Sequence, residues 1–251
     1  MKEIIIAMDS FKGSMTSLEA GNAIKKAIQN IHPAWNIQVY PVADGGEGTL
    51  EALTYQQKVT RCTCMITGPL GNPIKASYLW YQRNFEKTAI IEMAQAAGLP
   101  LVPEEKRNPL HTTTYGVGEL IQNAIRQGCT RFIIGIGGSA TNDAGVGMLQ
   151  ALGYHFYDVS GKEVPFGAKG LEKIVNIRTE DVSENLLKCQ FQIACDVKNP
   201  LVGVSGCSRI YGPQKGATEK ETDKMDSAME QFANLVEDTA WQDKKRIHPK
   251  G

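Results

Sequence analysis

The sequence predicts an α/β protein with a largely parallel sheet, and three stretches carry this prediction. Residues 131–152 read as a buried strand, a glycine loop and a helix. Residues 2–30 and 37–51 show the same order, in which an apolar strand runs into a polar loop and then into a helix. A repeated order of strand, loop and helix is typical of parallel strands covered by helices.

Composition limits the class of protein. A chain of 251 residues is long enough for one large or two modest domains. Its 27 basic and 27 acidic residues cancel, which gives no electrostatic reason to expect a nucleic-acid or anionic-membrane partner. The apolar run from Ile4 to Met8 is too short for a signal peptide and no run reaches membrane-spanning length, so we expect a cytoplasmic protein. The six cysteines and four histidines lack disulfide or metal-site spacings, which indicates reduced thiols.

The first strand, residues 2–8, leads into a polar loop and a helix over residues 17–30. Asp9, Ser10 and Lys12 stand in this loop, at the carboxyl end of a strand, where open α/β sheets bind their ligands. Asp9 and Ser10 are also common turn-forming residues, so a purely local role is the alternative interpretation.

The second strand, residues 37–42, runs into a loop in which Asp44 and Glu47 are interleaved with glycines. An acidic glycine loop after a strand is suited to hold a magnesium ion, a substrate hydroxyl, or both. The other interpretation is a glycine-rich junction that opens a helix near Thr49.

The middle of the chain changes pattern. Residues 59–81 form short alternating segments with glycine and proline between them, which predicts antiparallel strands and a separate lobe. A further strand, residues 89–93, carries Glu92 at its end, as a candidate substrate or metal contact or as a helix-capping acid. Three threonines, residues 112–114, then precede a helix with apolar residues at helical spacing. We interpret them as a helix cap, although their hydroxyls also suit a phosphate.

The glycine loop after the strand at residues 132–134 is the most distinctive local motif. Its glycines let the backbone turn sharply and approach a ligand closely. We expect a helix to follow at once with Thr141 or Asn142 as its cap, and the free N–H groups of such a helix start can bind phosphate. Asp143 in the first turn would then either cap the helix or share the site with a cation. An ordinary strand-to-helix turn is the alternative.

The same loop also matches a second motif. Gly135-x-Gly137-x-x-Ala140 has the spacing of the dinucleotide-binding fingerprint, and Asp158 lies downstream, near where a ribose-binding acid is expected. This match favours an NAD-dependent oxidoreductase acting on a hydroxy acid as an alternative function.

A late strand, residues 191–195, ends in a second candidate site. Asp196 and Asn199 follow it, and oxygen ligands of this kind suit a hard cation that bridges phosphates. Lys215 lies between glycines further on and is placed to reach a phosphate as a point charge.

The last predicted element is an amphipathic helix over residues 219–238. Met225, Met229 and Phe232 belong to its apolar stripe, which we interpret as core packing. Residues 241–251 are basic and polar and show no clear closing strand or helix.

Taken together, five ordered blocks resemble the bacterial glycerate kinase family of the two-domain type. The blocks are residues 9–14 (DSFKGS), 43–49 (ADGGEGT), 135–143 (GIGGSATND), 195–201 (CDVKNPL) and 211–216 (YGPQKG). The resemblance implies ATP-dependent phosphorylation of D-glycerate in a cleft between a Rossmann-like parallel-sheet domain and a second α/β domain. It assigns residues 1–58 to the N-terminal part of the first domain and residues 59–251 to the second. Family members continue beyond the equivalent of Gly251, so we expect a C-terminally truncated chain with an incomplete first domain.

The resemblance and the motifs together predict roles for individual residues. Nucleotide phosphates are expected at Gly137, Gly138, Ser139, Thr141 and Lys215. Magnesium is expected at Asp196, helped by Asn199 or Asp143. Glycerate is expected at Asp9, Ser10, Glu47 and Glu92, close to the expected catalytic residues Lys12, Asp44 and Asp196.

Several alternatives stay open at this point. Asp196 and Asp44 are both candidates for the base that accepts the hydroxyl proton, and the product is 2- or 3-phosphoglycerate. An inactive fragment of the kinase, an oligomerising module and the oxidoreductase are the competing functions. Homo-oligomer formation is left open.

Overall fold

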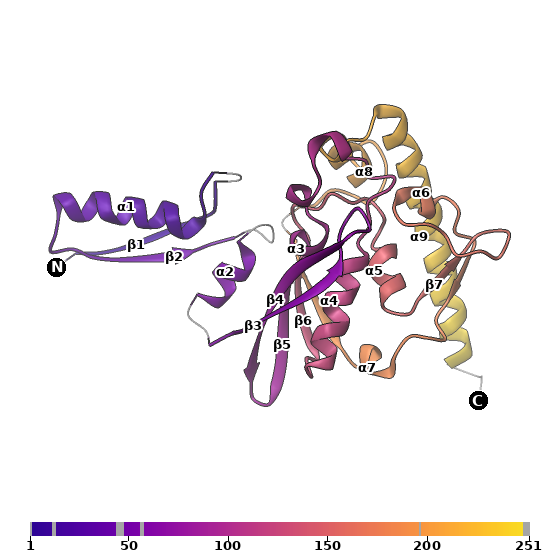
Figure 1. The fold of residues 1–251 in the computed structure, drawn as a ribbon, viewed down its shortest axis with the longest axis horizontal. Coiled ribbons are helices and arrows are strands. Elements are labelled where there is room, and N and C mark those ends of the chain that lie inside the picture. Colours follow the sequence, from indigo (N-terminus) through magenta and orange to yellow (C-terminus); the bar gives the residue numbers. More distant parts are fainter. Residues whose placement is uncertain (1, 12–13, 44–47, 56–57, 196, 248–251) are drawn as a thin grey trace.

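The computed structural model describes residues 2–11, 14–43, 48–55, 58–195 and 197–247. Within these residues the strands form one sheet of five strands and two sheets of two strands (Figure 1). Helices cover the sheets, so the predicted α/β class is confirmed.

The N-terminal unit consists of β1 (Glu3–Met8), α1 (Ser17–Ile31) and β2 (Asn36–Pro41), which lie to one side of the remaining elements in Figure 1. The two strands pair in parallel, and α1 packs on one face of the pair. Helix α1 begins with a capping box in which Thr16 and Glu19 each bond the other's backbone N–H group. The predicted strand, helix and strand are confirmed here within one or two residues.

The central sheet has the strand order β3-β4-β5-β6-β9. Three antiparallel strands come first, β3 (Thr60–Thr67), β4 (Pro73–Arg83) and β5 (Glu86–Glu92). Two further strands, β6 (Arg131–Gly135) and β9 (Gln190–Ala194), continue the sheet in parallel with β5. The antiparallel segment predicted for residues 59–81 is therefore confirmed, and it leads into a parallel edge.

Helix α4 (Tyr115–Arg126) packs on one face of this sheet and forms the main core with it. Its apolar stripe includes Val117, Leu120 and Ile121, all almost fully buried against residues such as Phe132. The 3.6-residue spacing of these side chains is what the sequence pattern predicted. The shorter elements are α2 (Thr49–Thr54), α3 (Ala94–Ala97), η1 (Leu99–Leu101), η2 (Glu104–Lys106), α5 (Val146–Ala151), β7 (His155–Tyr157), α6 (Ala168–Leu171), β8 (Asn176–Arg178), α7 (Glu184–Leu187), α8 (Cys207–Tyr211) and η3 (Pro213–Lys215).

Helix α9 (Glu219–Ile247) is longer than predicted. The expected helix ended at Asp238, and the interpretation that residues 241–251 hold no helix was wrong for residues 241–247. The physical reason is that glycine and proline are both absent between Glu219 and Ile247, so no residue in this stretch stops the helix. Met225, Met229 and Phe232 are buried as expected.

None of the helices in the described part of the chain is long and apolar enough to cross a membrane. The division into domains at residues 1–58 and 59–251 stays a prediction.

Candidate active site at the carboxyl ends of the parallel strands

Three parallel strands end level with one another. In the sheet register Glu92 of β5 pairs with Gly135 of β6, and Gly135 pairs with Ala194 of β9. The segments that follow these strands therefore start from one edge of the sheet. This is the edge at which open α/β sheets bind ligands.

The glycine loop is held by its neighbours through backbone hydrogen bonds. Leu99 N donates to the carbonyl of Gly138 at 2.9 Å, and Ala140 N donates to the carbonyl of Ala97 at 2.8 Å. Gly138 adopts φ of +71°, a left-handed conformation that favours glycine. The loop is therefore fixed against the segment that follows β5.

The helix after this loop begins later than predicted. Helix α5 starts at Val146, and its N-cap is Gly145 with φ of +74°. The expectation that Thr141 or Asn142 caps a helix immediately after the loop was wrong. Ala144 also has positive φ, so the backbone leaves helical geometry before α5.

Asp143 is engaged by the protein itself. Its Oδ2 accepts hydrogen bonds from Thr114 N at 2.9 Å, Thr114 Oγ1 at 2.8 Å and Gly147 N at 3.3 Å, and Oδ1 accepts from Gly145 N at 3.2 Å. The residue is only 2% exposed, and this burial raises the pKa of the carboxyl against the opposing effect of the Thr114 hydrogen bonds. A magnesium ion at Asp143 would have to compete with these four donors.

Of the three threonines before α4, Thr114 belongs to the same network. Thr114 occupies the N-cap position of α4, but its side chain does not cap the helix. Its hydroxyl instead bonds Asp143 and accepts from Met148 N at 2.9 Å, which ties the start of α4 to α5. The predicted helix-capping role is therefore wrong for the Thr114 side chain.

Lys215 lies against the glycine loop, although the two are far apart in the sequence. Its Nζ donates to the carbonyl of Thr141 at 2.6 Å and to Ser139 Oγ at 3.1 Å. The residue is 8% exposed, and burial lowers its pKa from 10.5 to about 8, while Cys207 and Asp143 act in the opposite direction. An ammonium group has three N–H donors, so one remains beyond these two contacts.

The residues expected at the magnesium site are only partly described. Asn199 accepts a hydrogen bond from Tyr211 OH at 2.6 Å on Oδ1, and its Nδ2 donates to the carbonyl of Ser205 at 3.0 Å. Within the described ranges, no three histidine, cysteine, aspartate or glutamate side chains are grouped to hold a metal ion. Four of the expected site residues lie outside the described residues: Lys12, Asp44, Glu47 and Asp196.

A cavity of about 550 Å³ lies where the loop after β1, helix α2 and the end of β5 come together. Its polar lining includes Ser10, Glu51, Arg61, Glu92 and Gln95. Among the described residues no atom bonds the Ser10 Oγ, which is buried although the residue lines the cavity. Asp9 is not part of the lining, and its Oδ1 accepts from Ser10 N at 2.7 Å, as in its alternative role as a turn former.

Glu92 connects this cavity to the sheet. It is 4% exposed, its Oε1 accepts from Leu50 N at 2.7 Å in the first turn of α2, and its Oε2 accepts from Gln95 Nε2 at 3.4 Å. Arg61 and Gln95 were not anticipated from the sequence. Arg61 lies at the start of a strand and no local motif marks it, so only its place in the cavity reveals it.

The segment between the cavity and the glycine loop is short. Met93 N donates to the carbonyl of Gly135 at 2.8 Å, and Gly98 forms a β-bridge with Ser139. Residues 93–98 thus run from the cavity, which Glu92 and Gln95 line, to the glycine loop at Ser139.

The dinucleotide-binding alternative finds no support in this geometry. Its fingerprint needs a helix that starts at the glycine loop, whereas α5 starts at Val146. Asp158, the expected ribose ligand, is instead used by a turn in which its Oδ1 accepts from the Ser160 hydroxyl at 2.7 Å and from Lys162 N at 3.1 Å.

Comparison with known proteins identifies the family. The sequence model of the "Glycerate kinase family" matches residues 4–251. The chain is 47% identical over 94% of its length to a glycerate kinase from Haemophilus influenzae and 46% identical over 98% of its length to a glycerate 2-kinase from Escherichia coli. A crystal structure provisionally described as glycerate kinase 2 from Salmonella typhimurium LT2 superposes with a TM-score of 0.80 at 42% identity and covers 94% of this chain.

The match covers only part of each relative. This chain spans 62% of the length of each of these relatives and of the crystallised chain. Nearly the whole chain is nevertheless covered at high identity, and the fold agrees over the same length. The chain therefore belongs to the glycerate kinase family.

Proposed function

We propose that this protein acts as a glycerate kinase, which transfers the γ-phosphoryl group of ATP to a hydroxyl group of glycerate. The observation that carries the proposal is the position of the 550 Å³ cavity, which residues 93–98 connect to the glycine loop at the shared strand edge. Membership of the family supports it. The activity is a proposal because the chain spans 62% of its relatives' length.

Glycerate fits the chemistry of the cavity. It is a small acid with one carboxylate and two hydroxyl groups, and a guanidinium group such as that of Arg61 binds carboxylates through paired N–H donors. The unpartnered hydroxyl of Ser10 supplies a further hydrogen bond. Contacts from Asp9, Glu47 and Glu92 belong to the same proposal.

The glycine loop and Lys215 are proposed to bind the nucleotide phosphates. Loop residues without bulky side chains allow close approach of phosphate oxygens to backbone N–H groups. The ammonium group of Lys215 adds a positive charge at the same place, and one of its N–H donors remains for a phosphate oxygen. The expected contacts are Gly137, Gly138, Ser139 and Thr141.

A magnesium ion bound beside the phosphates would neutralise the charge that develops during transfer. Asp196 is the residue proposed to hold it. Asn199 can help to hold it, because its Oδ1 accepts one hydrogen bond, from Tyr211, and an amide oxygen has a second lone pair. Asp143 fits this role less well, because it is buried and four N–H and O–H donors already bond its oxygen atoms. The protein's own contribution is to align the acceptor hydroxyl with the phosphoryl group and to exclude water.

Asp196 and Asp44 are the proposed acceptors of the hydroxyl proton, and Lys12 is the third proposed catalytic residue. Either hydroxyl of glycerate can be the acceptor. The relative from Escherichia coli is named a glycerate 2-kinase, so 2-phosphoglycerate is the first product to look for. Cytoplasmic location and homo-oligomer formation stay predictions.

A coupled assay of ADP release tests this function. Purified protein with ATP, Mg²⁺ and D-glycerate should release ADP, and ³¹P NMR of the product should distinguish the 2-phosphate from the 3-phosphate. Asp196→Asn should lower turnover by at least about a hundredfold, in line with removal of a group that acts in the transition state. Turnover within a few-fold of the parent would exclude the role of Asp196.

Controls separate the competing functions. Saturable binding of NADH without binding of ATP would favour the oxidoreductase. A cooperative melt by circular dichroism together with no ADP release would favour a folded but inactive fragment.

A further inference from the structure

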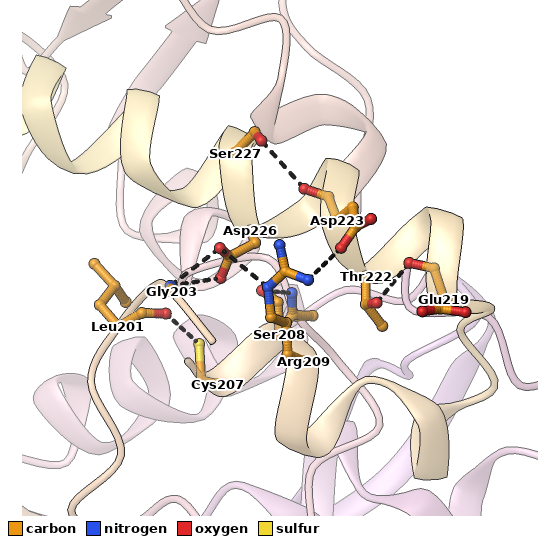
Figure 2. Close-up of polar contacts among 11 residues, drawn as sticks. Leu201, Gly203, Cys207, Ser208, Arg209, Glu219, Thr222, Asp223, Asp226 and Ser227 are labelled. Carbon is orange, nitrogen blue, oxygen red and sulfur yellow. Dashed lines mark hydrogen bonds and ion pairs between the residues drawn. The ribbon is translucent and has the colours of Figure 1, made fainter. Parts of the chain in front are cut away.

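Helices α8 and α9 hold the loop at residues 199–206, which follows β9, through hydrogen bonds. Figure 2 shows this loop beside α8 and α9. Gly203 N donates to both carboxylate oxygens of Asp226, at 3.2 Å to Oδ1 and 3.0 Å to Oδ2. Cys207 N, at the start of α8, donates to the carbonyl of Pro200 at 3.1 Å. The loop therefore has a defined conformation that depends on side chains distant in the sequence.

Burial of the Asp226 carboxylate, in a residue that is only 8% exposed, costs free energy unless the charge is paired. Arg209 of α8 supplies the countercharge, with its Nε 3.6 Å from Asp226 Oδ2. Arg209 also forms an ion pair with Asp223, one turn earlier on α9, as Figure 2 shows. Asp223 is more exposed, and among the described residues the amide of Gly203 bonds Asp226 and not Asp223. The two aspartates therefore share Arg209 as a partner, but Asp226 alone bonds the loop.

Two glycines of the loop allow its backbone to approach the carboxylate group of Asp226 closely. Gly203 has φ of +98°, which a side chain would strain. A Cβ atom on Gly206 would lie 2.9 Å from Asp226 Oδ1 and 2.6 Å from the carbonyl carbon of Val202. Two glycines thus let the loop close around Asp226.

The same two helices and η3 also hold the glycine loop. Asn142 Nδ2 donates to Ser208 Oγ of α8 at 2.9 Å and lies 3.5 Å from Met225 Sδ of α9. Lys215 of η3 donates to the carbonyl of Thr141 and to Ser139 Oγ. One structural unit, residues 207–229, is therefore bonded to both loops that follow β6 and β9.

We propose that Asp226, neutralised by Arg209, is a positioning residue that fixes the 199–206 loop relative to the glycine loop. It touches neither substrate nor nucleotide and acts through the backbone of Gly203. The inference rests on the proposed function, in which Asn199 helps to hold magnesium beside the phosphate-binding loop. Its consequence is that Asp226 controls affinity for the nucleotide without contacting it.

Three variants test the proposal. Asp226→Ala removes both acceptors of the Gly203 amide, whereas Asp226→Asn keeps one acceptor and should rescue part of the effect. Asp223→Asn is the matched control, because it weakens the ion pair of the same Arg209 and leaves the bonds to Gly203 in place.

Hydrogen exchange measures directly how firmly Asp226 holds the loop at residues 199–206. In Asp226→Ala the peptide covering residues 199–206 should exchange about ten- to a hundredfold faster, which corresponds to loss of a hydrogen bond to a charged group. A peptide from β4 and β5 should keep its rate, which shows that the variant is folded. Affinity for MgATP, measured by calorimetry on the same proteins, should fall about tenfold in Asp226→Ala, as for losses of supporting contacts around a metal. The fall should be smaller in Asp226→Asn and absent in Asp223→Asn.

Two results would overturn the proposal: unchanged exchange of residues 199–206 in Asp226→Ala, or equal loss of MgATP affinity in Asp226→Ala and Asp223→Asn. If the unaltered protein does not bind MgATP, the proposed function fails instead. The exchange measurement then still decides whether Asp226 anchors the loop, so the two failures are distinguishable.

Discussion

Replacement of Lys215 by methionine tests the buried ammonium group beside the glycine loop. Two opposing effects act on the free energy of unfolding at pH 7. The fall in pKa from 10.5 to about 8 means that holding the charge in this site costs about 3 kcal/mol relative to water, at 1.36 kcal/mol for each pKa unit. Loss of the hydrogen bonds to Thr141 and Ser139 costs about 1.5 kcal/mol each, because the donor is a charged group. Because these effects nearly cancel, Lys215→Met should change the unfolding free energy at pH 7 by less than about 2 kcal/mol.

The pH dependence of this difference is the sharper measurement. The folded protein releases the Lys215 proton near pH 8 and the unfolded chain near pH 10.5, so between these values the unfolded chain binds more protons. Raising the pH through this window therefore favours the folded state. Relative to Lys215→Met, the parent should gain about 3 kcal/mol of stability between pH 7.5 and 10.5. Urea denaturation of both proteins at several pH values measures this gain.

Groups other than Lys215 titrate in both proteins and cancel in the difference. A difference that is flat from pH 7.5 to 10.5 would refute the claim that Lys215 is buried as a charged group. MgATP binding supplies the functional comparison: Lys215→Met should weaken it by at least about tenfold if the ammonium group contacts phosphate.

Three further predictions follow from single contacts. Asp143→Asn places an NH₂ group among backbone donors, and urea denaturation should show a loss of about 3 kcal/mol of stability; a loss below about 0.5 kcal/mol would contradict the structural role. His155 lies 2.8 Å from both Glu163 and Asp181, and these hydrogen bonds raise its pKa. Its contribution to stability should be complete below pH 6.5 and be lost as the pH rises through the raised value, and NMR titration should give a pKa above 6.5 that disappears in His155→Gln. Arg61→Gln should raise the KM for glycerate about tenfold with little change in the KM for ATP, and equal changes in both would argue against a carboxylate contact.

Local patterns predicted the elements whose signals are complete within a few residues. Helix α1 was predicted over residues 17–30 and spans Ser17–Ile31, and the strand predicted at 132–134 lies within β6. Both depend on side-chain periodicity and on capping residues next to the element. The helix expected immediately after the glycine loop begins only at Val146, because Asn142 bonds Ser208 of α8 and is not free to cap. Asp143 accepts from Gly145 N and Gly147 N at the start of α5, in line with the capping role that was one of its two interpretations.

The residues of the candidate site also differ in whether the sequence alone reveals them. Residues 135–143 and Lys215 were recognisable as motifs, and both were expected to bind the nucleotide phosphates, but their direct contact came only from the structure. Arg61 and Asp226 carry no motif, because their importance comes from what the fold brings next to them.

The amino-acid sequence by itself determined the α/β class, most strand and helix positions and the family, because hydrophobic periodicity and glycine loops are properties of short segments. Only the tertiary structure decided which polar atoms remain available for a ligand. Those atoms depend on hydrogen bonds between residues far apart in the chain, such as Thr114 with Asp143 and Ser139 with Lys215, which are separated by 29 and 76 positions. A buried carboxylate or ammonium group is bonded by whatever the fold places within about 3 Å, and that distance is set by the packing of whole elements.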